Sequence, residues 1–316
     1  TIGLGETNPL PFLAKSIHFL MKNSCCCIRQ KYKIEYICSM QVLSNIVPIF
    51  KSELSNLYDD REIVSIAYIS IEYVFGFNRS ECIINSSKTL ENDNLNKIYF
   101  IVNELKQKKP IQYILGETEF YGLKFKLNKS TLIPRPETEE LVEWVLKDSF
   151  DSAIDICSGS GCISIALAKA TNSKVSAIDI SNDAINIAKE NATLNNVRVD
   201  FYCNDIFAIN NLQKSDVIVS NPPYVLESEK IYINTNVLNF EPHIALFVED
   251  NNPLVFYNKI AKLATQSLNI GGVLFFEINP LLSKEIKILL CGLGFVDIEL
   301  KKDINDKIRM VKAIWK

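Results

Sequence analysis

The sequence predicts an α/β protein with a mostly parallel sheet, helices on both of its faces and an antiparallel hairpin at one edge. A small helical domain is expected to precede it. Short apolar runs alternate with helical patterns over residues 153–278, which is typical of a parallel sheet. The last two predicted strands, residues 296–300 and 309–314, are separated only by a polar loop, which indicates the hairpin.

The length of the chain suggests about two domains, and its composition is that of an ordinary globular protein. The chain has 316 residues, of which 47% are hydrophobic and 22% charged. Lys and Arg total 34 against 37 Asp and Glu, so the basic excess typical of nucleic-acid-binding proteins is absent. Nine cysteines occur without a CxxC pair, so we expect no metal site and a reducing, cytoplasmic compartment. No apolar run approaches the length of a membrane span.

Residues 1–39 differ in character from the rest of the chain. They contain four of the nine cysteines and no clear hydrophobic period. Because Met40 looks like an ordinary start, we expect this extension to be upstream sequence included with the reading frame. A targeting segment is the alternative, since five Lys and Arg residues outnumber two Glu residues there.

Residues 40–110 are predicted to form the helical domain. One helix is expected from Asp59 to Phe75, and another should end at Pro110. The second helix carries an apolar stripe with helical spacing at Ile98, Ile101, Val102 and Leu105. No glycine-rich loop or catalytic cluster is present in this part of the sequence, so the domain is expected to be structural or to dock a partner.

Residues 111–135 have the composition of strands and are punctuated by Gly116 and Gly122. They predict a β-hairpin connector. The α/β domain should then occupy residues 136–316. At its start, Thr138 is expected to be the N-cap of a helix whose first turn carries several glutamates, because negative charge suits the positive end of a helix.

A loop of small residues joins the first predicted strand of the α/β domain to its helix. The candidate binding residues of this loop are Asp155, Cys157, Ser158, Gly159, Ser160 and Gly161. Small residues let a ligand approach the backbone, and a helix N-terminus offers free N–H groups. Such a loop can also be a simple tight connection.

Two acids follow at the ends of the next strands. Asp179 lies about 20 residues after the loop, where an acid can accept hydrogen bonds from both ribose hydroxyls of a nucleoside. It could instead only cap the next helix. Asp205 can accept from an adenine amino group while Ile206 covers the ring, although a solvated turn fits these two residues nearly as well.

Asn221, Pro222, Pro223 and Tyr224 follow the fourth strand and form the most informative stretch. Consecutive prolines fix φ and restrict the residues before them, so the loop is stiff. The side-chain oxygen of Asn221 and the carbonyl of Pro222 can together accept both N–H groups of one planar NH₂. An amide nitrogen is a poor nucleophile, so we expect catalysis by positioning against a sulfonium methyl group. This mechanism needs no histidine base. The alternative to a catalytic role is that the stretch is only an ordinary stiff loop.

With these motifs the chain resembles the HemK/PrmC family of N5-glutamine methyltransferases, which act on class I peptide chain release factors. The resemblance covers about residues 40–316 and is dense in residues 110–117, 132–139, 221–224 and 241–246. It implies a Rossmann-like, class I methyltransferase fold, S-adenosyl-L-methionine as cofactor and a release factor as protein partner. A monomer that binds neither nucleic acid directly nor membranes is expected.

The resemblance also implies residue roles. The loop from Cys157 to Gly161 would cradle the methionine part of the cofactor, with Asp179 on the ribose. Asp205 and Ile206 would flank the adenine, and the Asn221 stretch would grip the substrate glutamine. Phe120 and Arg135 are expected to line the cofactor pocket or the target channel.

One residue departs from the family pattern. Cys157 replaces the first glycine of the usual loop, and binding should survive because cysteine is small. Two alternative activities remain at this point. A ribosomal-protein glutamine methyltransferase differs in the Ile133–Glu139 stretch, and an adenine-N6 nucleic-acid methyltransferase shares only the Asn-Pro-Pro-Tyr motif.

Overall fold

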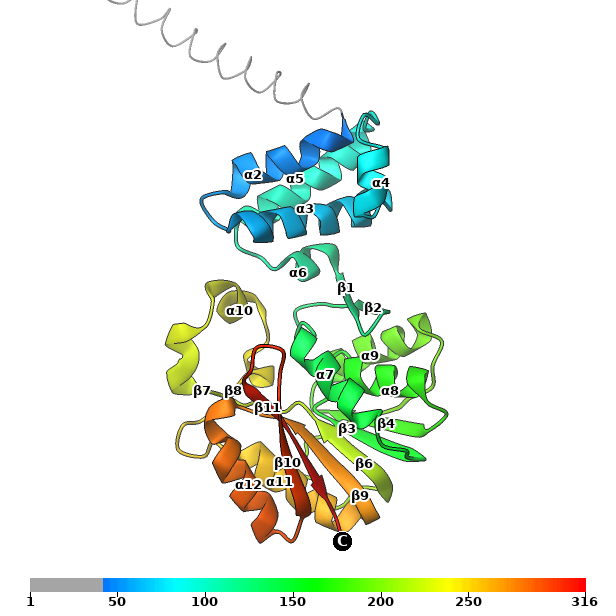
Figure 1. Ribbon diagram of the computed structural model, residues 1–316, viewed down its shortest axis with the longest axis vertical. Helices are drawn as coiled ribbons and strands as arrows, with labels where there is room; N and C mark the ends of the chain where they lie inside the picture. The colour runs from blue at the N-terminus through cyan, green and yellow to red at the C-terminus, as the bar shows by residue number, and fades with distance from the viewer. Residues whose placement is uncertain (1–41) are drawn as a thin grey trace, which may run out of the picture. The chain divides into compact units, whose positions relative to one another are not determined.

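The computed structural model describes residues 42–316, and both predictions for residues 1–39 lie outside this range. The chain divides into two compact units, of which the first ends at Gln107 and the second begins at Lys108. The described part of the first unit is helical (Figure 1). Its elements are η1 (Leu43–Asn45), α2 (Ile46–Leu54), α3 (Asp60–Phe75), α4 (Arg79–Ile84) and α5 (Asn92–Lys106).

Both helices predicted in the first unit are confirmed. Asp59 caps α3 by accepting the backbone N–H groups of Arg61 and Glu62, and Gly76 ends it in the left-handed conformation. Helix α5 ends at Lys106, a few residues before Pro110. The predicted stripe of α5 is buried against α2 and α3, and its members are Ile98, Ile101, Val102 and Leu105.

The second unit begins with α6 (Ile111–Leu115) and the hairpin of β1 (Glu117–Phe120) and β2 (Leu123–Lys126). The hairpin was predicted, but the expected strand character of residues 111–115 was wrong. Pro110 starts a short helix there, and Gly116 ends it with φ of 74°, because a glycine adopts that conformation at little cost. The hairpin packs on α9 (Asn182–Leu194), where Asn191 exchanges two hydrogen bonds with the backbone of Lys126.

A seven-stranded sheet forms the centre of the second unit, in the order β5-β4-β3-β6-β9-β11-β10. Neighbours from β5 to β9 are parallel, whereas β11 is antiparallel to both β9 and β10. The predicted edge hairpin is therefore confirmed. The strands are β3 (Ser152–Ile156), β4 (Lys174–Asp179), β5 (Asp200–Cys203), β6 (Ser215–Ser220), β9 (Leu268–Glu277), β10 (Val296–Lys302) and β11 (Ile308–Ile314).

Helices cover both faces of this sheet (Figure 1). Alternate residues of β3 point to opposite faces, as the period of a strand requires. Ala153 joins the core under α7 (Pro136–Val145), α8 (Cys162–Ala170) and α9, whereas Ile154 and Ile156 join the core under α11 (Val255–Ser267) and α12 (Ser283–Gly292).

The segment between β6 and α11 carries small additional elements. These are β7 (Val225–Leu226), η2 (Glu227–Tyr232), α10 (Thr235–Phe240), η3 (His243–Ala245) and β8 (Phe247–Val248). Elsewhere in the chain, the short helix η4 (Pro280–Leu282) precedes α12. β7 and β8 pair in parallel. No helix among residues 42–316 is long and apolar enough to cross a membrane.

Thr138 does not cap helix α7, so that prediction was wrong. The N-cap is Arg135, and Pro136 takes the first helical position, where the missing N–H of proline costs nothing. Thr138 lies in the first turn of the helix, and its buried hydroxyl donates to Glu277 instead. This contact brings α7 to the end of β9, next to the candidate site.

Candidate functional site

The loop between β3 and α8 has an unusual backbone. Cys157, Gly159 and Gly161 have φ angles of 62°, 53° and 78°. Glycine reaches this left-handed region freely, whereas a residue with a Cβ pays about 1–2 kcal/mol to do so. The departure from the family pattern at Cys157 therefore falls at a strained position. No atom lies within 4 Å of the place that a Cβ on Gly159 would take, so the backbone is open there.

Asp179 holds this loop against the end of β4. Its carboxylate accepts the Gly159 N–H at 2.8 Å and the Ser181 N–H at 2.9 Å. Burial raises the pKa of Asp179, and these backbone hydrogen bonds act in the opposite direction. The cap of α9 is Ser181, which accepts from the Ala184 N–H. Asp179 therefore is not the cap of α9, and its carboxylate instead joins the loop after β3 to the end of β4.

A pocket opens at the carboxyl ends of β3, β4, β5 and β6, where β3 lies between β4 and β6. This is the place where open α/β sheets bind ligands. The pocket is lined by Ser130, Leu132, Cys157, Gly159, Ile178, Asp179, Ile180, Ser181, Ala184, Asn204, Asp205, Ile206, Phe207, Asn221, Pro223, Ile244, Ala245 and Phe256.

The pocket combines an apolar wall with carboxylates. Phe207 and Phe256 meet edge to face at 5.2 Å between ring centroids, and Ile206 is buried beside them. Asp205 accepts the Phe207 N–H at 2.8 Å and also lines the pocket. A flat, partly polar ring would find both packing and an acceptor there.

Two buried polar atoms near the loop have no hydrogen-bond partner, and they are Asp155 Oδ1 and Ser158 Oγ. Burial raises the pKa of Asp155 to about 7, although the other oxygen accepts from Ser164. Buried polar groups are normally paired. An unpaired carboxylate oxygen and an unpaired hydroxyl are groups of the kind that pair with the ammonium and carboxylate of an amino acid, which is the part of the cofactor expected at this loop. Neither Asp155 nor Ser158 is part of the pocket lining.

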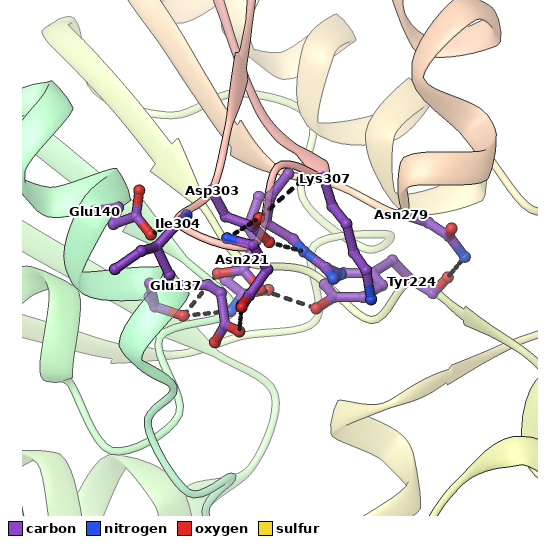
Figure 2. Close-up of polar contacts among 12 residues, drawn as sticks. Glu137, Glu140, Asn221, Tyr224, Asn279, Asp303, Ile304 and Lys307 are labelled. Carbon is purple, nitrogen blue, oxygen red and sulfur yellow. Dashed lines mark hydrogen bonds and ion pairs between the residues drawn. The ribbon is translucent and has the colours of Figure 1, made fainter.

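The loop after β6 carries the Asn-Pro-Pro-Tyr motif. Pro222 and Pro223 are buried, and Asn221 is half-buried at the pocket wall. The Asn221 Nδ2 group donates to Thr138 Oγ1 at 3.3 Å, and the Tyr224 hydroxyl donates to Glu277 Oε1 at 2.9 Å. Figure 2 shows Asn221 and Tyr224 within one group of polar contacts that also includes the turn at residues 303–307. Both ends of the motif are thus anchored by side chains.

The chain before α7 and the chain after α10 are fastened together beside the pocket. Arg135 Nη2 lies 2.5 Å from the buried Glu241 carboxylate, which also accepts the Ile133 N–H at 3.2 Å. Ser130 and Leu132 on one side, and Ile244 and Ala245 on the other, line the pocket. The ion pair therefore links two segments of its wall.

The structure brings several predicted site residues together at the pocket surface, and these are Cys157, Gly159, Asp179, Asp205, Ile206, Asn221 and Pro223. Others lie close by in sequence without lining it: Asp155 is in strand β3, and the same loops contain Ser158, Ser160, Gly161, Pro222 and Tyr224. Phe120 is 1% exposed in the core, edge to face with Phe125. Arg135 contacts Glu241. Neither Phe120 nor Arg135 is part of the pocket lining.

Several pocket residues were not predicted from the sequence, and among them are the aromatic pair of Phe207 and Phe256 and the residues Ser130, Ile244 and Ala245. Phe207 follows Ile206 directly, so its position was a usable signal. The others come from segments far apart in the chain, and nothing local marks them. Among residues 42–316, no group of three or more His, Cys, Asp or Glu residues could hold a metal ion.

Comparison with known proteins identifies relatives of both units. A family described as "Methyltransferase small domain" matches residues 136–239, and one described as "PrmC N-terminal domain" matches residues 50–116. A protein of Flavobacterium psychrophilum named "Release factor glutamine methyltransferase" is 46% identical over 86% of this chain and 99% of its own length. A protein of the same name from Bacteroides thetaiotaomicron is 36% identical over 86% and 99%, respectively.

Proposed function

Because this chain belongs to the family of release factor glutamine methyltransferases, we propose that it methylates the side-chain amide nitrogen of a glutamine in a class I peptide chain release factor. The methyl donor is S-adenosyl-L-methionine. The observation that carries this proposal is the position of Asn221, which lies at the pocket wall with its Nδ2 group bonded to Thr138. Its Oδ1 atom is thereby left to accept a proton donor of the substrate.

The pocket has suitable groups for each part of the cofactor. Asp179 would accept from the ribose hydroxyls, since each carboxylate oxygen can accept more than one hydrogen bond. Asp205 and Ile206 would hold the adenine, with Phe207 and Phe256 against its ring. The loop from Cys157 to Gly161 would take the methionine part. The cofactor supplies a methyl group that is already activated by a positively charged sulfur.

The protein's part in the reaction is to position the target nitrogen. Asn221 Oδ1 and the Pro222 carbonyl would accept the two N–H groups of the glutamine amide. Rigid positioning can supply about 7–11 kcal/mol in favourable cases, and two successive prolines give the loop that rigidity. A proton can leave after transfer, because an N-methylated amide that carries an extra proton is strongly acidic.

Histidine has no part in this scheme. His243 lies in η3, where its Nε2 atom is 2.8 Å from the Leu238 carbonyl and its ring meets Phe247 edge to face. It is not among the residues that line the pocket. The residue is therefore placed to fix the segment after α10.

We assign substrate docking to the first unit, in keeping with the expected helical docking domain at residues 40–110. Its described surface carries large exposed apolar side chains, including Tyr73, Ile83, Ile84 and Phe100. Exposed apolar groups of this kind favour protein partners. The domain matches a family described as an N-terminal domain of PrmC proteins.

The proposal is tested by incubating the purified protein with labelled S-adenosylmethionine and a purified class I release factor. We expect label in the release factor, and peptide mass spectrometry should locate it on a single glutamine. The control is the release factor with that glutamine replaced by alanine. Equal labelling of the control, or no labelling of the wild-type factor, would overturn the proposal.

A further inference from the structure

Glu277 is a buried carboxylate that lies at the end of β9 and bridges two side chains. It is 1% exposed. Its Oε2 atom accepts the hydroxyl of Thr138 at 2.6 Å, and its Oε1 atom accepts the hydroxyl of Tyr224 at 2.9 Å. Two donors on two different oxygens match an ionised carboxylate, which only accepts.

The hydrogen bond to Glu277 determines whether Thr138 can donate to Asn221 or only accept from it. A hydroxyl has one proton, and that of Thr138 is donated to Glu277. Its oxygen can therefore only accept from a third group. Asn221 meets this requirement with its Nδ2 atom at 3.3 Å. The reversed amide would place Asn221 Oδ1 against another acceptor, so this orientation of the Asn221 amide is favoured.

Several charged and titratable groups surround Glu277. Burial raises its pKa, whereas the hydrogen bonds from Thr138 and Tyr224 and the positive charge of Arg309 lower it. The negative charge of Glu137, in α7, raises the pKa of Glu277 and has the smallest effect of these groups. From α11, the hydroxyl of Tyr257 donates to the backbone carbonyl of Glu277 at 3.3 Å. Arg309 is itself paired with the buried Asp303.

We propose that Glu277 and Thr138 are positioning residues of the methyl transfer, which fix the Asn221 amide with its oxygen free for the substrate NH₂. This inference rests on the proposed function. Glu277 acts only while ionised. Once protonated, it must donate to one of its partners or lose a contact, and Thr138 could then donate its proton to Asn221. That change favours the reversed amide, which presents a donor where the substrate needs an acceptor.

The first experiment compares Thr138→Val with Thr138→Ser, which keeps the hydroxyl. We expect Thr138→Val to lower kcat/KM for the release factor about tenfold to hundredfold, as misplacement of a catalytic group commonly does. Thr138→Ser should restore most of the rate. Affinity for S-adenosylhomocysteine should stay within about threefold of wild type in both variants, because the orientation of Asn221 mainly affects the substrate.

A matched control is Thr171→Val. Like Thr138, Thr171 has a hydroxyl that both donates and accepts: it donates to the Leu167 carbonyl and accepts the Ser173 N–H. It lies at the end of α8 and outside the pocket lining. The control should keep the wild-type kcat/KM. Equal rates for Thr138→Val and wild type, with an active wild type, would overturn the positioning role alone.

A pH profile separates positioning from a structural role. At saturating cofactor, kcat of the wild type should fall as pH drops through the pKa of Glu277. Glu277→Gln should be slower and should lose this acidic limb, since glutamine does not titrate. An unchanged acidic limb in Glu277→Gln would contradict the proposal. A wild type that methylates no release factor at any pH would instead overturn the proposed function.

Discussion

Arg135 and Glu241 form an ion pair 2.5 Å long although 106 residues separate them in the chain. The Glu241 side chain is 1% exposed, whereas that of Arg135 is 33% exposed. The pair fastens the segment before α7 to the segment after α10, and each of these segments contributes residues to the pocket wall, Leu132 from the first and Ile244 from the second. A contact of this kind should contribute both to stability and to the shape of the pocket.

Replacement of Glu241 by alanine should lower the free energy of unfolding by about 2–3 kcal/mol. This is below the usual 3–5 kcal/mol for a broken buried pair because Arg135 is partly solvated. Denaturant unfolding measures the change. The control is Glu190→Ala, which breaks the exposed pair with Lys126 and should cost under about 1 kcal/mol. Equal losses in the two variants would show that Glu241 has no special role.

Cys157 occupies a left-handed backbone position, so a larger side chain there should be poorly tolerated. Cys157→Val should destabilise the protein by about 1–3 kcal/mol, because β-branched residues are strongly disfavoured at positive φ. Cys157→Gly should fold and bind S-adenosylhomocysteine as the wild type does. Thermal unfolding and calorimetric titration measure both effects. Cys203→Val, on strand β5, is the control and should be nearly neutral. If the Cys157→Val protein were as stable as the wild type, the backbone at residue 157 would not be strained.

The buried Asp155 should make stability depend on pH. Its pKa is raised to about 7 by burial, so the folded state binds its proton more tightly than the unfolded state does. This contribution is fully present below the unfolded pKa of about 4 and is lost as pH rises to about 7. Relative to Asp155→Asn, the wild type should therefore lose stability between those values. A difference in unfolding free energy that is constant from pH 4 to 7 would contradict the assignment.

Asp179 should matter for the cofactor more than for the protein fold. Asp179→Asn keeps the shape but removes the charge, and it should weaken S-adenosylhomocysteine binding by about 1.5–3 kcal/mol, or roughly tenfold to a hundredfold. Calorimetric titration gives the dissociation constant. Asp183→Asn, in the exposed first turn of α9, should bind as the wild type. If both variants bind equally well, Asp179 does not hold the ribose.

Much of the second unit could be predicted, because its signals are local. Alternation of apolar strands and amphipathic helices predicted the parallel sheet and its edge hairpin, and both are confirmed. The short helix α6 was mistaken for a strand since Ile111, Tyr113 and Ile114 are common in strands. Its flanking residues Pro110 and Gly116 mark the true boundaries.

The contacts that organise the candidate site could not be predicted in the same way. The loops at the strand ends were recognisable because small residues, acids and prolines follow apolar strands at regular places. Glu277, by contrast, is the last residue of an apolar strand, and it lies 139 residues after Thr138. Which side chain such a carboxylate meets depends on which helix covers the strand end, and that is a property of the whole fold. Thr138 therefore looked like a helix cap in the sequence.

The most direct test concerns Asn221, whose oxygen is proposed to accept a proton of the target amide. In Asn221→Ala, methyl transfer to the release factor should slow by on the order of a hundredfold or more, as with the loss of other preorganised polar groups. Binding of S-adenosylhomocysteine should remain close to that of the wild type. Transfer at the wild-type rate by Asn221→Ala would contradict the account.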